Sequence, residues 1–541
     1  MNYSSPNDAD LTINYDPTLN EANEIAKQNI RMCMGENRCG CRGVPPAGKG
    51  YEDGVWLADA LWAFIDGIIY WVTPKESKSY LYSEDPKAMG VIPFFANLQE
   101  KTGEHAGNIP VAKYKTKDHG WMGEYDIDYG GMFDLAYVPR KNHRDEAGSG
   151  FFFIEAMHRY WKYFNDESYL IKYYDVMRKY VNYRLKNIDE KTGLFRSTYG
   201  LGDVCIDYAV PKSCALIYNN AFCYATFKRF SEIAKAIGKS NDAEKYWKIA
   251  EKMKKGINTY LWDEKLGYYK IKIFCNPTTN KNSPAYGITE DNHFFVAGNM
   301  MMIYFEIPDN MHKIKTLMAN IEKADGKLKL YGQSVEPPYP NGWHNKIFND
   351  GTYWNGDVWP CFGSWYAIAL FRLGYPDEAL RILSRQAEVA VRDKGFYEYY
   401  EDDEEGAGKG AFYYCFTAAP YQAALVRGLF GLDADYPNRR IYIHPSLRHS
   451  GSISCQLGAH NLKMSADVEN HQNKIILTID TTYSGQANFK VLVKNGAGSC
   501  EVTKDDGTNV PCYIKRIGKA NYVIFDTNIN MGLNVLNISV S

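Results

Sequence analysis

The pattern that most constrains this fold is a helical hairpin that recurs along most of the chain. In each copy an aromatic-rich helical stretch ends in a short turn, and an Asp or Asn then opens a second amphipathic helix. The segment LGYPDEALRILSRQAEVAV is an example. Pro376 and Asp377 suit the first turn of its second helix, because proline needs no donor there and aspartate faces the positive end of the helix dipole.

This pattern predicts twelve helices in six hairpins, which can close into a toroid with an inner and an outer ring. We expect this mainly α, (α/α)6 domain to occupy residues 1–437. The helices are predicted over residues 18–34, 55–72, 84–101, 148–164, 168–187, 217–238, 241–258, 290–304, 309–324, 359–373, 376–393 and 415–431.

The pattern changes near the end of the chain. Segments such as KIILTIDTT and ANFKVLVKN alternate in the manner of strands and are separated by Gly, Asn and Asp. Residues 438–541 are therefore predicted to form a small β-sandwich domain that packs on the helices. The connections between the hairpins are long and aromatic, and loops of this length in a compact domain are usually functional. They cover residues 102–147, 188–216, 259–289, 325–358 and 394–414.

Charge and composition narrow the classes of partner. The 541 residues carry 62 Lys and Arg against 64 Asp and Glu, a net charge of −2. This balance argues against nucleic acid or an anionic membrane as a partner. Aromatic residues make up 15% of the chain. Their flat faces suit the C–H faces of sugar rings, so a carbohydrate partner is expected. The oligomeric state is left open.

The cysteines and the N-terminal segment favour a cytoplasmic protein without a cofactor. The 12 Cys form no CxxC pair and no Cys/His zinc spacing. A metal held by Cys33, Cys39 and Cys41 is the less favoured alternative to free thiols, and no metal is expected. The first residues are polar, and no apolar run reaches the ~18–20 residues of a membrane span. The sequence leaves open whether a signal peptide was removed from the chain.

One glutamate stands among aromatic residues in GFYEYY, residues 395–400. In a strand, Glu398 could simply point to water while Tyr397 and Tyr399 pack inward. The alternative is a catalytic carboxylate on a sugar-binding surface, with Tyr397 as part of the platform. The acidic run that follows, from Glu401 to Glu405, is typical of a solvated loop.

Two further segments offer carboxylates. GLGDVCIDY carries Asp203 and Asp207 before the sixth predicted helix, and Asp203 could alternatively be a plain turn residue. GYEDGVWLADALW enters the second helix with Glu52, Trp56, Asp59 and Trp62 as candidate sugar-binding residues. Trp56 and Asp59 are three residues apart and would share a helix face. An exposed or capping role for Asp59 is the alternative.

A fourth segment, PPYPNGWHNKIFNDGTYWNGDVWP, holds three tryptophans interleaved with Gly and Asn. Such density is unusual for a plain linker and indicates a binding surface, although the tryptophans could instead wedge the loop against the barrel rim. The candidate binding residues are Trp343, His344, Trp354, Asp357 and Trp359.

With these four segments in this order, the chain resembles the (α/α)6-barrel, or six-hairpin, glycoside hydrolases. That superfamily includes trehalase, processing α-glucosidase, mannosylglycerate hydrolase and α-L-rhamnosidases. FYEYY is similar to the motif that carries the catalytic base, which implies that role for Glu398. GLGDVCID is similar to the loop of the general acid, which implies Asp203 as first choice and Asp207 as second.

The resemblance further implies that Asp59 binds the sugar at the cleavage point and that hydrolysis proceeds with inversion, a mechanism that requires no metal. The long connections favour a closed pocket and therefore exo-action on short oligosaccharides or glycosides. The chain departs from it at Ala58 and Asn355, where relatives carry Arg. These departures concern the identity of the sugar more than the fold. A glycoside phosphorylase, a sugar epimerase using paired histidines, or a non-catalytic sugar-binding protein on the same barrel are the alternatives. For the epimerase, the candidate histidines have no obvious partners in the sequence.

Overall fold

The computed structural model of the protein describes residues 10–13, 16–34, 40–48, 54–116, 120–123, 148–197, 214–275, 281, 286–340, 351–469 and 472–541. Five of the predicted site residues lie outside this described part: Glu52, Asp203, Asp207, Trp343 and His344.

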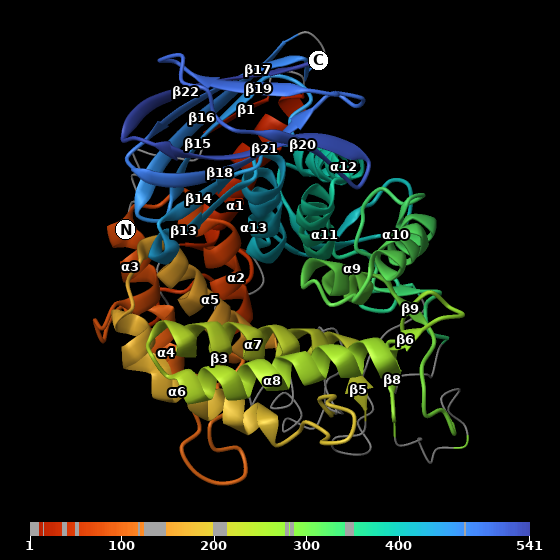
Figure 1. Ribbon diagram of the computed structural model, residues 1–541. Coiled ribbons are helices and arrows are strands. Elements are labelled where there is room, and N and C mark those ends of the chain that lie inside the picture. The colour runs from red at the N-terminus through yellow and green to blue at the C-terminus, as the bar shows by residue number, and fades with distance from the viewer. Residues whose placement is uncertain are drawn as a thin grey trace.

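Helices dominate the described part up to residue 429 (Figure 1). Thirteen α-helices occur there: α1 (Pro17–Cys33), α2 (Leu57–Asp66), α3 (Pro74–Tyr82), α4 (Val91–Asn97), α5 (Gly148–Phe164), α6 (Ser168–Leu185), α7 (Ile217–Ala236), α8 (Ser240–Gly256), α9 (Val296–Tyr304), α10 (Met311–Asp325), α11 (Pro360–Leu373), α12 (Pro376–Asp393) and α13 (Cys415–Ala423). A π-helical turn, η6 (Ala424–Leu429), continues α13.

The helices that bury most of their residues contact one another in cyclic order. Helix α2 contacts α5, α5 contacts α7, α7 contacts α9, α9 contacts α11, α11 contacts α13, and α13 contacts α2 again. The hairpin partners α6, α8, α10 and α12 contact α5, α7, α9 and α11 respectively. Helix α12 is amphipathic and buries one face only, whereas nearly every residue of α11 is buried. Each hairpin therefore buries its apolar surface against its neighbours.

The hairpin of α11 and α12 shows how the sequence sets the ends of its helices. Helix α12 begins at Pro376, with Asp377 and Glu378 in its first turn, and ends where Lys394 turns to a φ of 58°. Helix α11 ends at Gly374, which has a φ of 79° and therefore suits a residue without a side chain. Both termini agree with the predicted segment 376–393.

The third predicted helix, over 84–101, is wrong. The structure instead has α3 before this segment and the short α4 inside it. Thr73 and Glu76 form a reciprocal capping box that starts α3, with Pro74 in the first turn. Pro86 and Gly90 then keep residues 84–90 out of a helix, because neither residue supports a helix interior.

Close packing between α5 and α6 predicts a stability effect at Gly150. A Cβ atom at this position would lie 1.8 Å from Cζ of the buried Tyr180. Gly150→Ala is therefore expected to destabilise the protein by about 1–3 kcal/mol, the usual range for an overpacked core. Denaturant unfolding measures the difference. Gly498→Ala is the control, because the nearest atom to its Cβ lies 3.9 Å away; equal stabilities of the two variants would contradict the packing argument.

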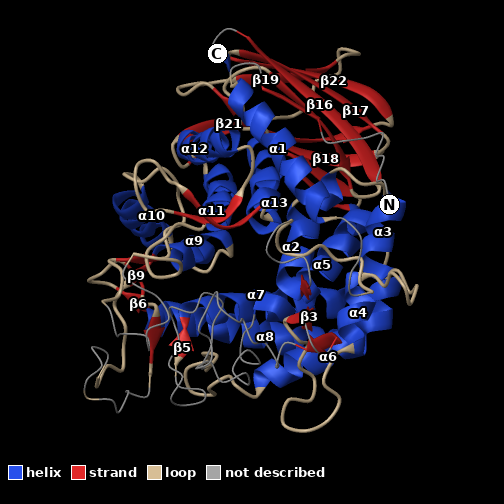
Figure 2. Ribbon diagram, turned by 180° about the vertical axis from the view of Figure 1, so that it is seen from behind, coloured by secondary structure: helices blue, strands red, loops and turns tan. Residues whose placement is uncertain are grey.

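Strands gather at one end of the molecule in two sheets (Figure 2). The six-stranded sheet has the order β1 (Asp10–Ile13), β15 (Gly451–Leu457), β16 (His460–Glu469), β17 (Lys474–Thr481), β22 (Gly532–Val540), β19 (Cys500–Lys504). The five-stranded sheet has the order β13 (Leu432–Asp435), β14 (Arg440–Ile443), β18 (Gly485–Val493), β21 (Ala520–Ile529), β20 (Tyr513–Ile517).

The strands of these two sheets pair antiparallel, except that β14 and β18 run parallel. The strand nature of the C-terminal segment thus agrees with the prediction, and β13 already starts at Leu432. The N-terminal β1 was not predicted. It pairs with β15, with Leu11 opposite Ile453.

Short strands connect the helices at the loop ends. They are β2 (Gly54–Trp56), β3 (Ala112–Thr116), β4 (Gly120–Gly123), β5 (Ala215–Leu216), β6 (Trp262–Asp263), β7 (Tyr268–Tyr269), β8 (Lys272–Ile273), β9 (Phe294–Phe295), β10 (Val335–Glu336), β11 (Tyr397–Tyr400) and β12 (Gly408–Phe412). The hairpin of β11 and β12 carries Glu398.

Candidate active site

Glu398 is a buried carboxylate on β11. Its side chain is part of a residue only 3% exposed, and Oε2 accepts a hydrogen bond of 3.1 Å from the backbone N–H of Ala411 on β12. Tyr397 and Tyr399 are half-buried, whereas Glu398 and Tyr400 are buried. The glutamate therefore lies on the inner face of the strand and the two tyrosines on the outer face. The interpretation of Glu398 as a water-facing strand residue is therefore wrong.

An aromatic cluster adjoins this carboxylate. The segment before α11 lies alongside β11, because Val358 and Tyr400 exchange backbone hydrogen bonds of 2.8 and 2.9 Å. The Tyr399 ring stacks on Trp359 at 5.5 Å and 24°, and Trp359 stacks on Trp354 at 3.9 Å and 12°. Both tryptophans are nearly buried, at 4% exposure for Trp354 and 2% for Trp359. They form the wall behind Tyr399.

Asp357 is a second buried carboxyl group in this region. One of its oxygens accepts a hydrogen bond from the backbone N–H of Tyr353. Burial raises the pKa of Asp357 to about 7, and the charges of Asp402 and Glu401 add to the rise. Burial, followed by the charges of Asp357 and Glu398, raises the pKa of the Tyr399 phenol to about 12. Both carboxyl groups therefore lie near the same tyrosine.

The first turn of α2 supplies Trp56 and Asp59. Trp56 is half-buried and stands at the N-cap of the helix. Asp59 is half-buried, and its Oδ1 accepts a hydrogen bond of 3.4 Å from the Tyr414 hydroxyl. Burial raises the pKa of the Cys361 and Cys415 thiols, and the charge of Asp59 contributes to both shifts. Asp59 is thus close to the first turns of α11 and α13.

The N-termini of α2, α11 and α13 consequently meet at this end of the molecule. In none of these three helices does the N-cap side chain accept a hydrogen bond from the first turn. The first-turn N–H groups and the positive ends of the helix dipoles favour ionised carboxylates nearby.

Two predicted binding residues have other surroundings in the structure. Trp62 has no exposed surface; its Nε1 donates a hydrogen bond of 2.6 Å to Asp66, and its ring packs on Phe152 and Trp365. A fully buried indole presents no face to a sugar, so the assignment of Trp62 as a binding residue is corrected to the helical core. Tyr397 packs its ring against Phe412 at 4.6 Å.

The sequence interpretation considered His293 only for the epimerase alternative and missed its polar neighbours Asp291 and Tyr339. Asp291 accepts a hydrogen bond of 2.5 Å from the Tyr339 hydroxyl and lies 2.8 Å from Nδ1 of His293. Burial opposes ionisation of Asp291, but His293 and the charge of Lys272 outweigh it and lower the pKa of Asp291. The spacing DNH, with Asp two residues before His, was the available signal.

Asn355 occupies the position at which the similar motif of the resembled families carries an arginine. Its side chain accepts a hydrogen bond of 2.6 Å from the backbone N–H of Tyr339 and donates one of 3.0 Å to the Tyr339 carbonyl. Asn355 is 2% exposed. The side chain therefore holds the loop around Tyr339 in position.

The pKa of Asp357 predicts a pH effect on stability. In the unfolded chain this carboxyl titrates near pH ~4, whereas its pKa in the fold is about 7. Between these values the folded state binds more protons, so the contribution of Asp357 to stability falls as pH rises from about 4 to about 7. At pH 8 the Asp357→Asn variant should therefore have a free energy of unfolding about 1–2 kcal/mol higher than the parent, and a higher melting temperature. At pH 5 the increase in the free energy of unfolding should be smaller. Thermal unfolding at the two pH values checks this; an equal shift at both would contradict it.

Comparison with known proteins identifies the type of domain. Residues 211–417 match the family described as the mannosylglycerate hydrolase MGH1-like glycoside hydrolase domain. The matched segment is thus similar to a glycoside hydrolase domain. A mannosylglycerate hydrolase from Rubrobacter radiotolerans is 28% identical over 210 residues, which cover 38% of this chain and 42% of that protein. The predicted resemblance to the (α/α)6-barrel glycoside hydrolases is thereby confirmed.

Solved structures share the fold of this chain. An α-L-rhamnosidase from Dictyoglumus thermophilum has a TM-score of 0.62 at 12% identity and covers 99% of this chain and 51% of its own. A mannosylglycerate hydrolase from Thermus thermophilus in complex with glucose has a TM-score of 0.51 at 13% identity and covers 74% of this chain and 100% of its own. The chain thus spans about half the length of the rhamnosidase and less than half of the curated relative.

No three His, Cys, Asp or Glu side chains among the described residues are grouped so as to hold a metal ion. None of the helices in the described ranges has the length and apolar character needed to span a bilayer.

Proposed function

We propose that this chain is an inverting, exo-acting glycoside hydrolase. The single observation that carries the proposal is the buried Glu398 carboxylate beside the stacked aromatics Tyr399 and Trp359, at the end of the molecule where helix N-termini meet. A carboxylate seldom occupies such a position without a task. The glycoside hydrolase family match over 211–417 ends beyond Glu398 and thus includes it.

The proposed architecture is an (α/α)6 toroid over residues 1–437 with a β-sandwich domain over 438–541. The cyclic order of contacts from α2 through α5, α7, α9, α11 and α13 supports the toroid. In this arrangement the N-terminal ends of the inner helices surround the substrate, and the long connections form the walls of the pocket.

In the proposed reaction, Glu398 acts as general base and Asp203 as general acid, with Asp207 the second choice for the acid. Glu398 removes a proton from water as the water attacks the anomeric carbon. Asp203 protonates the glycosidic oxygen as the bond to it breaks. An inverting enzyme needs a gap of ~6.5–9.5 Å between the two carboxyl groups, because the water must fit between the base and the sugar.

The sugar-binding residues retained in the proposal come from three segments. Asp59 accepts hydrogen bonds from sugar hydroxyls in the cleavage subsite, and Trp56 offers a half-buried ring beside it. Trp354 and Trp359 support the aromatic wall, and Asp357, when protonated, can donate a hydrogen bond. The remaining members of the set are Glu52, Trp343, His344 and Tyr397.

The named relatives suggest the first substrates to test. Two are mannosylglycerate hydrolases, and a structural neighbour is an α-L-rhamnosidase. We propose a short glycoside as substrate, with glycosides of small organic acids as the first class. Ala58 and Asn355 occupy positions where the motifs of the resembled families carry Arg, so the panel of substrates must vary the sugar.

The deciding experiment is hydrolysis of a panel of aryl glycosides and short natural glycosides, followed by proton NMR from the first minutes. Inversion predicts that the first product has the anomeric configuration opposite to the substrate. A first product with retained configuration contradicts the base role of Glu398. Cleavage that requires inorganic phosphate and yields a sugar phosphate would assign a phosphorylase instead.

A further inference from the structure

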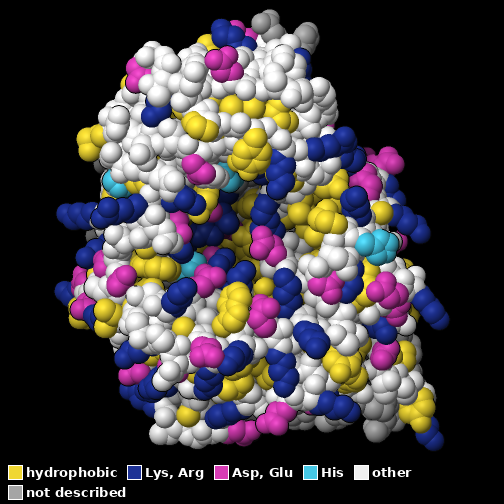
Figure 3. Space-filling model, in the orientation of Figure 1, with side chains coloured by type: hydrophobic (Ala, Val, Ile, Leu, Met, Phe, Trp, Pro, Cys, Tyr) yellow, Lys and Arg dark blue, Asp and Glu magenta, His cyan; other side chains and the backbone are white. Residues whose placement is uncertain are grey.

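A cavity of about 240 Å³ opens at the end of the helices opposite to Glu398. It is lined by the later parts of α2, α9 and α11, by α5 and α7, and by η6 and β13. Figure 3 shows the corresponding hollow in the face of the molecule, with Lys and Arg side chains inside it. Glu398, Asp59 and Trp359 do not line it, so it is separate from the proposed active site.

The walls of this cavity combine an apolar floor with charged groups. Ile65, Phe151 and Phe305 supply apolar surface. Tyr304 stacks on Trp365 with ring centroids 4.4 Å apart and an interplanar angle of 8°. Charged side chains from α5, α7, α11, η6 and β13 stand beside this apolar surface, so the cavity is a polar one with an apolar side.

Two of the carboxylates in the walls already have cationic partners. Glu155 lies 2.7 Å from Arg229 and 3.2 Å from Arg159. Glu306 lies 3.1 Å from Arg372, which also donates hydrogen bonds to two backbone carbonyls at the end of α9. These acids are therefore paired within the protein.

Arg427 is only 13% exposed, and among the described residues its Nη1 makes long contacts of 3.4 Å with Asp66 and 3.4 Å with the Tyr304 hydroxyl. Its Nε is 4.0 Å from Asp433 and has no hydrogen-bond partner in the described structure. Burial raises the pKa of Asp66 against the lowering effect of the Arg427 charge, and Trp62 and Trp365 donate hydrogen bonds to the other oxygen of Asp66. A buried cation with an unfilled donor is costly unless a further acceptor is present.

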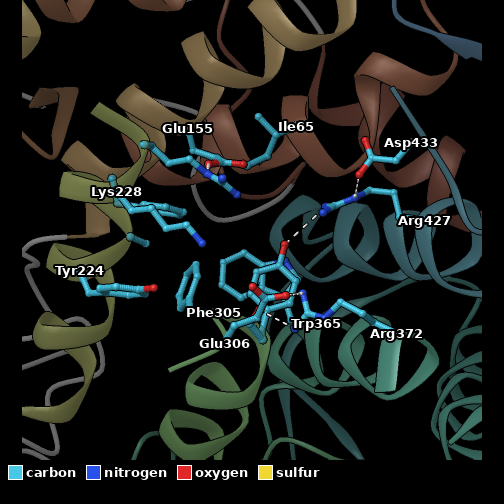
Figure 4. Close-up of a pocket in the computed structure, with 14 residues that line it drawn as sticks. Ile65, Glu155, Tyr224, Lys228, Phe305, Glu306, Trp365, Arg372, Arg427 and Asp433 are labelled. Carbon is cyan, nitrogen blue, oxygen red and sulfur yellow. Dashed lines mark hydrogen bonds and ion pairs between the residues drawn. The ribbon is translucent and has the colours of Figure 1, made fainter. Parts of the chain in front are cut away.

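Lys228 is the second cation with donors to offer. It is half-buried on α7, and no hydrogen bond or ion pair of its ammonium group occurs among the described residues. Figure 4 shows its amino group directed into the cavity from the wall facing Arg427. The two side chains thus present N–H groups to the same space.

We propose that this cavity is a second binding site, for a small organic anion whose carboxylate or phosphate oxygens bridge Lys228 and Arg427. An anion with several oxygens satisfies both donors, and charge-assisted hydrogen bonds are the stronger kind. Its carbon skeleton lies on Phe151 and Phe305. At ~30 Å³ per water molecule, the cavity holds about eight waters, room for an acid of three or four carbons. This assignment goes beyond the hydrolase function and does not depend on it.

The test measures binding of sodium phosphate and sodium glycerate to the full chain by calorimetric titration, at constant ionic strength set with sodium chloride. We expect at least one of these anions to bind the parent protein. Lys228→Gln should weaken it about tenfold, the effect of one charge-assisted hydrogen bond, and Lys228→Glu should abolish it. The matched control is Lys235→Gln, an exposed lysine on the same helix.

The two anions separate the two kinds of ligand. Lys228-dependent binding of glycerate alone identifies a carboxylate ligand, and Lys228-dependent binding of phosphate alone identifies a phosphate ester. Glu398→Gln should bind the anion like the parent, because it changes the other end of the molecule. Absence of binding with both anions, or unchanged binding in a folded Lys228→Glu variant, would overturn the proposal. Arg427→Gln is not used, since loss of a buried charge next to Asp66 endangers folding.

Discussion

Glu398→Gln is expected to lower kcat by about 10²–10⁴-fold, the usual contribution of a positioned general base. The glutamine amide cannot take a proton from the attacking water, whereas it keeps an oxygen that can accept the hydrogen bond of 3.1 Å from the Ala411 N–H. The hairpin of β11 and β12 should therefore stay folded. The measurement is kcat on the best substrate of the panel, together with thermal unfolding to show that the variant is intact.

The matched control is Glu404→Gln, which removes an exposed carboxylate from the acidic loop after β11. It makes the same chemical change six residues along the chain and should leave kcat unchanged. If Glu398→Gln keeps a kcat close to that of the parent while Glu404→Gln does the same, Glu398 is not the base. If both variants lose activity together, the hairpin rather than the carboxylate carries the effect.

The second large effect is expected from Asp203→Asn. A general acid matters most when the leaving oxygen is basic, so kcat on an alkyl or natural glycoside should fall by about 10²–10⁴-fold. With a nitrophenyl glycoside the leaving group departs without full protonation, and the fall should be much smaller. Parallel kinetics on the two substrates give the ratio that distinguishes loss of an acid from loss of folding.

Asp207→Asn is the comparison for this experiment, because Asp207 is the second choice for the acid. If Asp203 is the acid, Asp207→Asn should lower kcat by the same factor on both substrates or leave it unchanged on both. The opposite pattern, with the leaving-group dependence in Asp207→Asn, would move the role to Asp207. A base behaves differently from either, since Glu398→Gln should depress both substrates alike.

Much of the fold was predictable because the hairpins have strong local signals. The segments 148–164 and 376–393 agree with α5 and α12 at both ends. The segment 84–101 failed because apolar periodicity outweighed Pro86 and Gly90 in the prediction. Strand β1 could not be predicted, because four residues carry little pattern of their own and the partner strand lies more than four hundred positions away.

The site was predictable only in part. Glu398 was selected because FYEYY is similar to the motif of the catalytic base; its burial agrees with that selection, and its role as base stays a prediction. Trp62 was misassigned because the 3.6-residue period does not distinguish a helix side facing the core from one facing a cavity. The cavity near Lys228 and Arg427 had no sequence signal at all, since its lining comes from seven separate elements that meet only in the folded chain.

The pairing of β1 with β15, and of α1 with α12 and α13, has a consequence for how the chain is made. Helix α1 leaves the ribosome long before α12 and α13 are synthesised. Its apolar face therefore stays exposed until residues 376–423 have followed. Such long sequence separations slow folding and prolong exposure of apolar surface. Biosynthesis of this molecule should therefore depend on chaperones that hold nascent chains, and a break of the polypeptide between these partners should leave two insoluble pieces.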